Sequence, residues 1–150
     1  MLRAIPMATR SRIGYQLKDG SIVSVYCHWD GYPEFNGRVL RDNYTTVERV
    51  RDLLDGGNIS ALHTNAGWQN ETLPEVGPLY YTSRGETIED NAPKYHTNLN
   101  DFMIYADEGN GCDYTYHFVD GEWVCHDLND GPDRHMVKQV AIPTGSVGEE

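Results

Sequence analysis

Two Asp-Gly dipeptides, each placed between alternating apolar residues, constrain the fold of this chain more than any other sequence feature. Asp19-Gly20 separates the segment 12–18 from the run 22–29, and Asp120-Gly121 separates 114–119 from 122–126. An Asp-Gly pair in this setting is a strong short-range signal for a β-hairpin with a two-residue turn. The sequence therefore predicts two antiparallel hairpins, with these facing pairs: Ile13 and Tyr26, Leu17 and Ile22, Tyr116 and Cys125, Phe118 and Trp123.

The second strand of the first hairpin is apolar on both of its faces. Val25, Cys27 and Trp29 alternate along one face, and Ile22 and Tyr26 lie on the other. A strand of this kind is typical of the interior of a sheet that is covered on both sides. We therefore expect this segment to be a central strand.

Three short helices are predicted around the hairpins. The first covers 38–44, the second begins after a cap at Thr45 or Thr46 and ends at Gly56-Gly57, and the third runs from a cap at Asn98 to about Asp107. The remaining expected elements are short strands at 59–62, 79–82 and 137–142, and loops at 30–37, 63–78 and 87–97. The predicted fold class is α+β, a mostly antiparallel sheet with two Asp-Gly hairpins and two or three short packed helices.

The length of 150 residues suits one domain. We expect a disordered leader at 1–10, a single α+β domain at 11–142 and a disordered tail at 143–150. The leader lacks the apolar run of a signal peptide, and Met7 is an alternative start to Met1.

The charge of the chain limits its partners. The formal net charge is −11 and the pI is about 4.8, which disfavours direct binding of nucleic acids or anionic membranes. No stretch approaches the roughly 18 apolar residues that span a membrane. The acidic residues are scattered among arginines rather than gathered in runs, so an acidic DNA mimic is a minor alternative. The odd count of three cysteines favours a reducing compartment.

An aromatic-rich octapeptide, Tyr26-Cys27-His28-Trp29-Asp30-Gly31-Tyr32-Pro33, is the most specific motif of the chain. We call it the signature. With Arg12-Ile13-Gly14, Gly57 to Leu62, Arg84-Gly85-Glu86 and the closing hairpin, it resembles a family of small uncharacterised phage and prophage proteins over roughly residues 11–128. The resemblance implies a phage accessory protein acting in the host cytoplasm. It implies no activity and no catalytic residue.

Metal and nucleophilic chemistry are both disfavoured by the sequence. Zinc requires three or four converging ligands, but Cys27 and His28 point to opposite faces of a regular strand, as do Cys125 and His126. Cys27 is expected among core residues, where a thiol is inert. There is no Walker loop and no Gly-x-Ser-x-Gly motif. We therefore expect no metal, no cofactor and no enzymatic activity; a small metal- or thiol-dependent hydrolase is the alternative.

Binding is the function that the sequence favours. Aromatic faces stack on bases or rings, arginine pairs with phosphate, and both residue types concentrate in protein interfaces. The expected partner is a host protein or a defence-related, nucleotide-like signal, which the protein would neutralise or redirect. In the structural alternative, Trp29 and Tyr32 pack in the core and Arg84 forms an ion pair. The sequence leaves the host target and homo-oligomerisation open. The candidate ligand- or partner-binding residues are His28, Asp30, Tyr32, Phe35, Arg84 and Glu86.

Overall fold

A single mixed sheet of eight strands organises the molecule. The computed structural model describes residues 8–62, 77–130 and 136–145. The strand order is β4-β3-β2-β1-β6-β7-β8, and β5 pairs with β2 beside β3. The strands are β1 (Ser11–Gln16), β2 (Ile22–Trp29), β3 (Ile59–Ala61), β4 (Leu79–Tyr80), β5 (Lys94–His96), β6 (Tyr114–Val119), β7 (Glu122–Asp130) and β8 (Met136–Val140).

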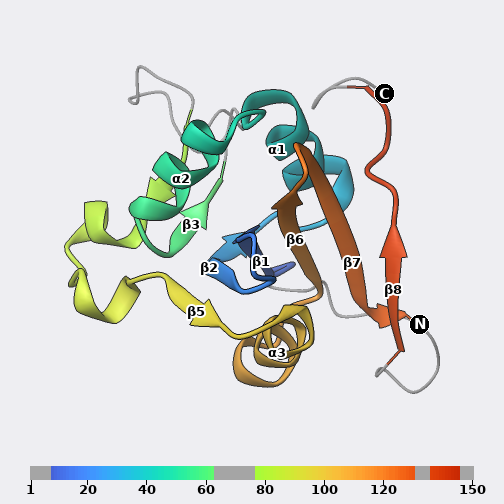
Figure 1. Cartoon of the computed structure of the whole chain (residues 1–150). Coiled ribbons are helices and arrows are strands. Elements are labelled where there is room, and N and C mark those ends of the chain that lie inside the picture. The colour runs from blue at the N-terminus through green and yellow to red at the C-terminus, as the bar shows by residue number, and fades with distance from the viewer. Residues whose placement is uncertain (1–7, 63–76, 131–135, 146–150) are drawn as a thin grey trace, which may run out of the picture.

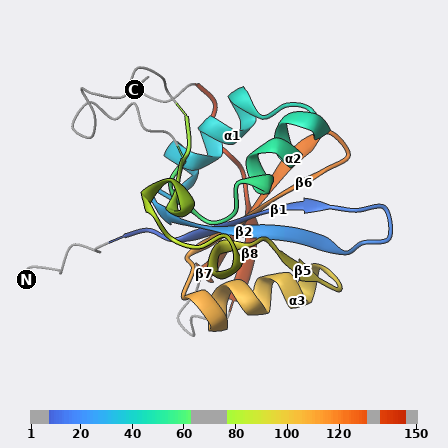
Figure 2. The ribbon, with the colours of Figure 1, turned by 90° about the vertical axis from the view of Figure 1, so that its left-hand side faces the viewer.

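Helices cover both faces of this sheet. Helices α1 (Arg38–Asn43) and α2 (Val47–Asp55) lie on one face, and α3 (Leu99–Ile104) lies on the other (Figures 1 and 2). Only the β1–β6 and β2–β3 pairings are parallel among the pairings of the described strands. The predicted α+β class with a mostly antiparallel sheet and two Asp-Gly hairpins is confirmed.

The second hairpin has the predicted register. Tyr116 pairs with Cys125, and Phe118 pairs with Trp123. The φ angles of Asp120 and Gly121 are 53° and 79°, which fits the two-residue turn whose central residues both need positive φ.

The predicted register of the first hairpin is wrong by one residue. Ile13 pairs with Val25 instead of Tyr26, and the loop has three residues, because the Leu17 N–H donates to the Ser21 carbonyl over 2.8 Å. The Asp19 carboxylate accepts hydrogen bonds from the Ser21 N–H and Oγ, which favours this longer turn. Gly20 has φ 91°, so the same dipeptide satisfies either loop length.

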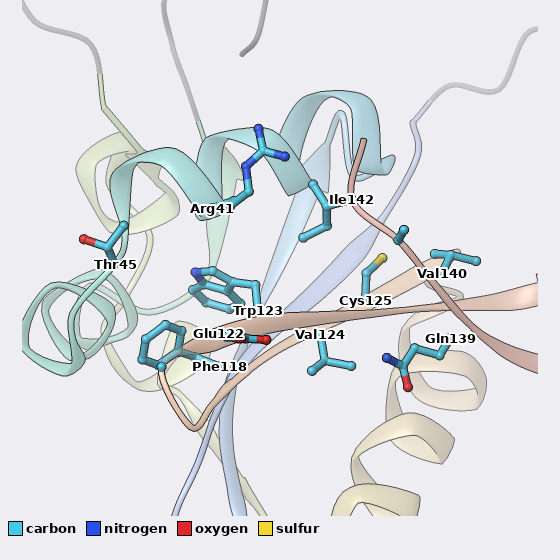
Figure 3. A pocket seen from close by; sticks show the side chains of 12 residues that line it. Arg41, Thr45, Phe118, Glu122, Trp123, Val124, Cys125, Gln139, Val140 and Ile142 are labelled. Carbon is cyan, nitrogen blue, oxygen red and sulfur yellow. The ribbon is translucent and has the colours of Figure 1, made fainter. Parts of the chain in front are cut away.

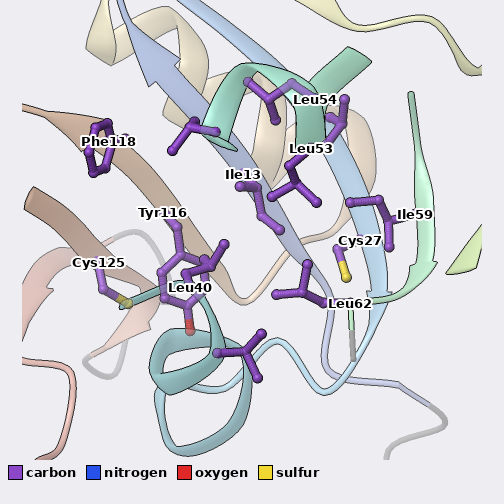
Figure 4. Close-up of a cluster of buried hydrophobic side chains, with 13 residues drawn as sticks. Ile13, Cys27, Leu40, Leu53, Leu54, Ile59, Leu62, Tyr116, Phe118 and Cys125 are labelled. Atoms are coloured by element: carbon purple, nitrogen blue, oxygen red, sulfur yellow. The ribbon is translucent and has the colours of Figure 1, made fainter. Parts of the chain in front are cut away.

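β2 is a central strand covered on both faces, as predicted. Val25 and Cys27 belong to the main hydrophobic core, which lies between the sheet and helices α1 and α2 (Figure 4). Ile22 and Ser24 are buried on the α3 face. The core is completed by residues of both hairpins and both helices, among them Ile13, Leu40, Val50, Leu53, Tyr116 and Phe118.

A buried polar layer lies under α3. The guanidinium of Arg12, only 2% exposed, donates through Nε to Ser24 Oγ over 2.7 Å and through Nη1 to Asn110 Oδ1 over 2.8 Å. Ser24 Oγ also lies 2.7 Å from His96 Nε2. On β6, the ring of His117 stacks on that of His126, with centroids 5.8 Å apart.

The predicted helix caps are present. Thr46 accepts a hydrogen bond from the Arg49 N–H, and Asn98 accepts one from the Asp101 N–H. Past α2, Gly57 has φ 84°, and a Cβ on it would lie 2.3 Å from the carbonyl oxygen of Asn91. This close approach explains the second glycine of the pair.

Two predicted loops contain regular structure. Pro33–Gly37 is a short π-helix that leads into α1, and the segment 87–97 contains β5 together with a 3-10 turn at Glu89–Asn91. In the sequence, Pro33 was interpreted as a sign of a loop, although proline is also common at the first position of a helix. In β5, only His96 is buried, so no alternation identifies the strand. The expected strand 79–82 ends at Tyr80 and continues as a 3-10 helix, Tyr81–Arg84.

Two residues near the start of the described chain, Thr9 and Arg10, bond to the fold. The Thr9 carbonyl accepts from the Gly31 N–H, and the Arg10 carbonyl accepts from the Asp113 N–H, so the end of the expected leader lies against the fold. Residues 1–7, 146–150 and most of the expected loop 63–78 lie outside the described residues. Within the described ranges, no helix is long and apolar enough to cross a membrane.

Candidate functional site

Polar side chains from four segments gather on the α3 face of the sheet, at β2 and β3. Tyr26 and His28 project from the same face of β2, because they are two residues apart in a strand. Ser60 lies beside them, since its neighbours in β3 pair with the neighbours of His28 in β2. Arg84 reaches this face from the 3-10 helix that follows β4. Together with Arg10 and Tyr81, these residues form what we call the arginine–tyrosine cluster.

Hydrogen bonds and ring contacts hold the cluster in place. The Tyr26 hydroxyl lies 2.7 Å from His28 Nδ1, and the His28 ring packs edge-on against Trp29 with centroids 4.7 Å apart. Arg84 donates from Nη1 to Ser60 Oγ over 3.1 Å, and its guanidinium lies 5.7 Å from the centre of the Tyr81 ring. Gly85, with φ 97°, ends the 3-10 helix directly after Arg84.

The cluster contains two positively charged side chains in a strongly acidic protein. Burial, followed by the positive charges of Arg10 and Arg84, lowers the pKa of His28. Neither guanidinium has a carboxylate of the described residues within ion-pairing distance, although the whole chain carries a net charge of −11. Both arginines are exposed. The cluster therefore offers two accessible cations, and a neutral imidazole and hydroxyls as hydrogen-bonding groups.

Most of the signature is structural. Gly31 allows close packing, since a Cβ there would lie 2.8 Å from the Thr9 carbonyl oxygen, and its own carbonyl accepts from the Tyr116 hydroxyl over 2.6 Å. The side chain of Asn36 is fully buried and donates to the Trp29 carbonyl over 3.1 Å. Cys27 is fully buried beside it. Of the signature, only Tyr26 and His28 belong to the arginine–tyrosine cluster.

The structure separates the six predicted site residues. His28 and Arg84 come together, but Asp30 and Tyr32 bond each other at the turn after β2, where the Tyr32 hydroxyl donates to Asp30 Oδ1 over 3.3 Å. The φ of Asp30 is 58°, a left-handed conformation that Asp tolerates. Burial raises the pKa of Asp30.

The remaining two residues have other contacts. Phe35 packs against the main core, and its ring meets that of Tyr32 with centroids 6.4 Å apart. Glu86 accepts from Asn91 Nδ2 over 3.4 Å. Arg84 makes no ion pair with either Asp30 or Glu86, all three of which the structure describes.

Four members of the cluster were not identified from the sequence. Arg10 was assigned to the leader, and Ser60 and Tyr81 lie in short elements whose neighbours depend on the fold. Tyr26 could have been found, because a residue two positions before His28 in a strand shares its face.

The cysteines are poorly suited to nucleophilic chemistry. All three are buried, and burial raises the pKa of each thiol to about 12. A thiolate is therefore scarce at neutral pH. In the part of the chain that the structure describes, no group of three or more His, Cys, Asp or Glu side chains is arranged to hold a metal ion.

Comparison with known proteins gives no relative from which a function could be transferred. No protein-family model matches the chain, and neither the curated proteins nor the solved structures include a match.

Proposed function

We propose that this protein is a non-catalytic phage accessory protein that binds a phosphate-bearing, nucleotide-like host molecule at the arginine–tyrosine cluster. The phage assignment rests on the resemblance of the signature and its accompanying motifs. The choice of an anionic small molecule rests on one observation: Arg10 and Arg84 are both near enough to His28 to lower its pKa, and neither guanidinium has an ion-pair partner among the described residues.

The chemistry of the cluster fits a phosphate. Arginine presents a planar fork of donors that binds phosphate oxygens in pairs, and such charge-assisted hydrogen bonds are about twice as strong as neutral ones. Neutral His28 and the Tyr26 hydroxyl add uncharged donors or acceptors. Tyr81 presents an aromatic ring next to Arg84, which suits stacking with a base.

The alternatives have less support. A thiol-dependent hydrolase requires an accessible thiolate, whereas the thiols are buried with raised pKa values. An acidic DNA mimic would present carboxylates at its recognition surface, whereas this surface presents cations. A host protein as the partner at this cluster is the main competing proposal.

Titration calorimetry with adenosine monophosphate, adenosine and inorganic phosphate tests the proposal. We expect adenosine monophosphate to bind and adenosine to bind at least tenfold more weakly, because only the former carries the anion. Arg84→Gln and Arg10→Gln should each weaken binding roughly 10- to 100-fold, the effect of losing about 1.5–3 kcal/mol from hydrogen bonds to a charged group. The matched control is Arg49→Gln, which changes an exposed arginine of α2 whose guanidinium lies over the ring of Tyr44.

Purification from infected cells gives the second readout. Mass spectrometry of small molecules released from the wild-type protein should show a phosphorylated compound that is absent from the Arg10→Gln/Arg84→Gln double variant. No binding of any of the three probes together with no released compound would refute the proposal. Equal loss with Arg49→Gln would also refute it, since the effect would then come from general charge.

A further inference from the structure

A groove of about 350 Å³ lies at the other end of the sheet, between α1, the start of β7 and the chain that leaves β8 (Figure 3). The side chain of Trp123 points toward α1 and the groove, and Ile142 and Arg41 lie on its far side. The indole Nε1–H is already used, since it donates to the Tyr44 carbonyl over 2.9 Å. β1 and β6 separate this groove from β2, which bears His28.

Among the described residues, none bonds the backbone of Trp123 at the groove. In a hairpin with a two-residue turn, the closing pair, Val119 and Glu122, exchanges both hydrogen bonds, so the N–H and C=O of Trp123 point away from β6. The next residues with that orientation, Cys125 and Asp127, pair with β8. No backbone hydrogen bond of the described residues uses the Trp123 N–H or C=O.

The chain after β8 leaves this position open because α1 holds it away. Arg38 donates to the Thr144 carbonyl over 2.8 Å, and Arg41 donates to the carbonyls of Pro143 and Gly145. Ile142 packs toward Gly37 at the start of α1. The pairing therefore ends at Cys125 and Val140.

We propose that the groove binds an extended peptide segment of a partner protein, which adds a short strand to the free edge of β7. One residue in extended conformation presents an N–H and a C=O on the same side, which is the complement of the free pair of Trp123.

The side chains of the groove define the preferred peptide. A residue opposite Trp123 places its side chain on the α1 side, against the rings of Trp123 and Phe118 and the side chain of Ile142. An apolar β-branched residue fits this position and favours the extended conformation. Basic flanking residues complement the net charge of −11. The proposal is independent of the anion site.

A short peptide with one chemical change tests the backbone pairing. The probe is acetyl-Lys-Thr-Ile-Thr-Lys-amide. The control is the same peptide with an N-methyl group on the backbone nitrogen of the central Ile. Two-dimensional ¹H–¹⁵N NMR of the full chain should show shifts of the Trp123 amide with the first peptide at millimolar concentration. The N-methyl peptide should bind at least tenfold more weakly, because it lacks the central donor.

Variants of the protein locate the site. Thr45→Tyr places a ring in the groove and should weaken binding of the unmodified peptide at least fivefold. Val137→Thr changes an exposed side chain of β8 outside the groove and should have no effect. Equal binding of the two peptides, or shifts confined to β5, would overturn the proposal.

Hydrogen exchange of the free protein excludes the other occupants. The Trp123 amide should exchange rapidly without peptide and slowly with it. Protection in the free protein at all concentrations would show that the segment 141–143 closes the edge. Protection that appears only at high protein concentration would show that a second copy closes it. Either result would overturn the proposal.

Discussion

Acid should weaken this fold through two buried histidines, His96 and His117. They are 7% and 3% exposed, respectively. Burial lowers the pKa of each to about 4; in His96 the nearby charges of Arg12 and Lys94 contribute further, and in His117 the neighbouring His126 does. In the unfolded chain both have a pKa near 6.5. Between pH 6.5 and 4, the unfolded state therefore binds more protons than the folded state.

The sign and size of the effect follow from this difference. Stability contributed by the neutral histidines is complete above about pH 6.5 and is lost as the pH falls toward 4. At about pH 5, a shift from 6.5 to 4 corresponds to a loss of about 2 kcal/mol for each histidine, or about 4 kcal/mol for both. That is a large part of the 5–15 kcal/mol that typically separates a folded domain from its unfolded state.

Urea unfolding at pH 7 and pH 5 measures the loss, and His117→Phe isolates one histidine. Nδ1 of His117 has no hydrogen-bond partner among the described residues, so a phenyl ring at this position removes no hydrogen bond of that atom. The variant should lose about 2 kcal/mol less than the wild type between the two pH values. NMR titration of the His117 ring gives its folded-state pKa directly. An unchanged pH dependence in the variant, or a measured pKa near 6.5, would refute the reasoning.

Three further perturbations test the packing. Gly57→Ala should lower the free energy of unfolding by more than 1 kcal/mol, because alanine would meet the Asn91 carbonyl at positive φ; a stability equal to wild type in urea would contradict the contact. Asn98→Ala should cost about 1 kcal/mol by removing the cap of α3, whereas Asn98→Asp should retain most of that stability. A thiol reagent should label the native protein slowly at pH 8 and rapidly in urea, and fast native labelling of any cysteine would contradict its burial; the three cysteines are Cys27, Cys112 and Cys125.

Local sequence patterns were enough to predict the hairpins and helices. The alternation in β2 placed Val25 and Cys27 on one face because the period of a strand is two, whatever the strand packs against. The caps at Thr46 and Asn98 were also predictable, because each side chain bonds an N–H only three residues further along the chain. The register of the first hairpin was not, because Asp-Gly fits both a two-residue and a three-residue loop.

Contacts between distant segments could not be predicted from the sequence. The parallel pairing of β1 with β6 joins residues about a hundred positions apart, and no local pattern records it. The same is true of the site. His28 and Arg84 were both predicted as binding residues, but Ser60, which bonds Arg84, is brought next to them only by the β2–β3 pairing. Arg10 is held near the cluster because its carbonyl accepts hydrogen bonds from the N–H groups of Asp113 and Tyr114.

The signature connects the two proposed binding regions without being either of them. Its strand half presents His28 to the arginine–tyrosine cluster, and its turn leads through the short π-helix into α1, which carries Arg41 above the groove. Gly37 lies where the π-helix meets α1, and it packs closely against the groove, since a Cβ there would lie 3.2 Å from a side-chain carbon of Ile142. Gly37→Ala should therefore displace Ile142 and alter peptide binding while leaving the His28 environment unchanged. A signature that mainly sets backbone geometry, as this one does, can be shared by proteins that bind different partners.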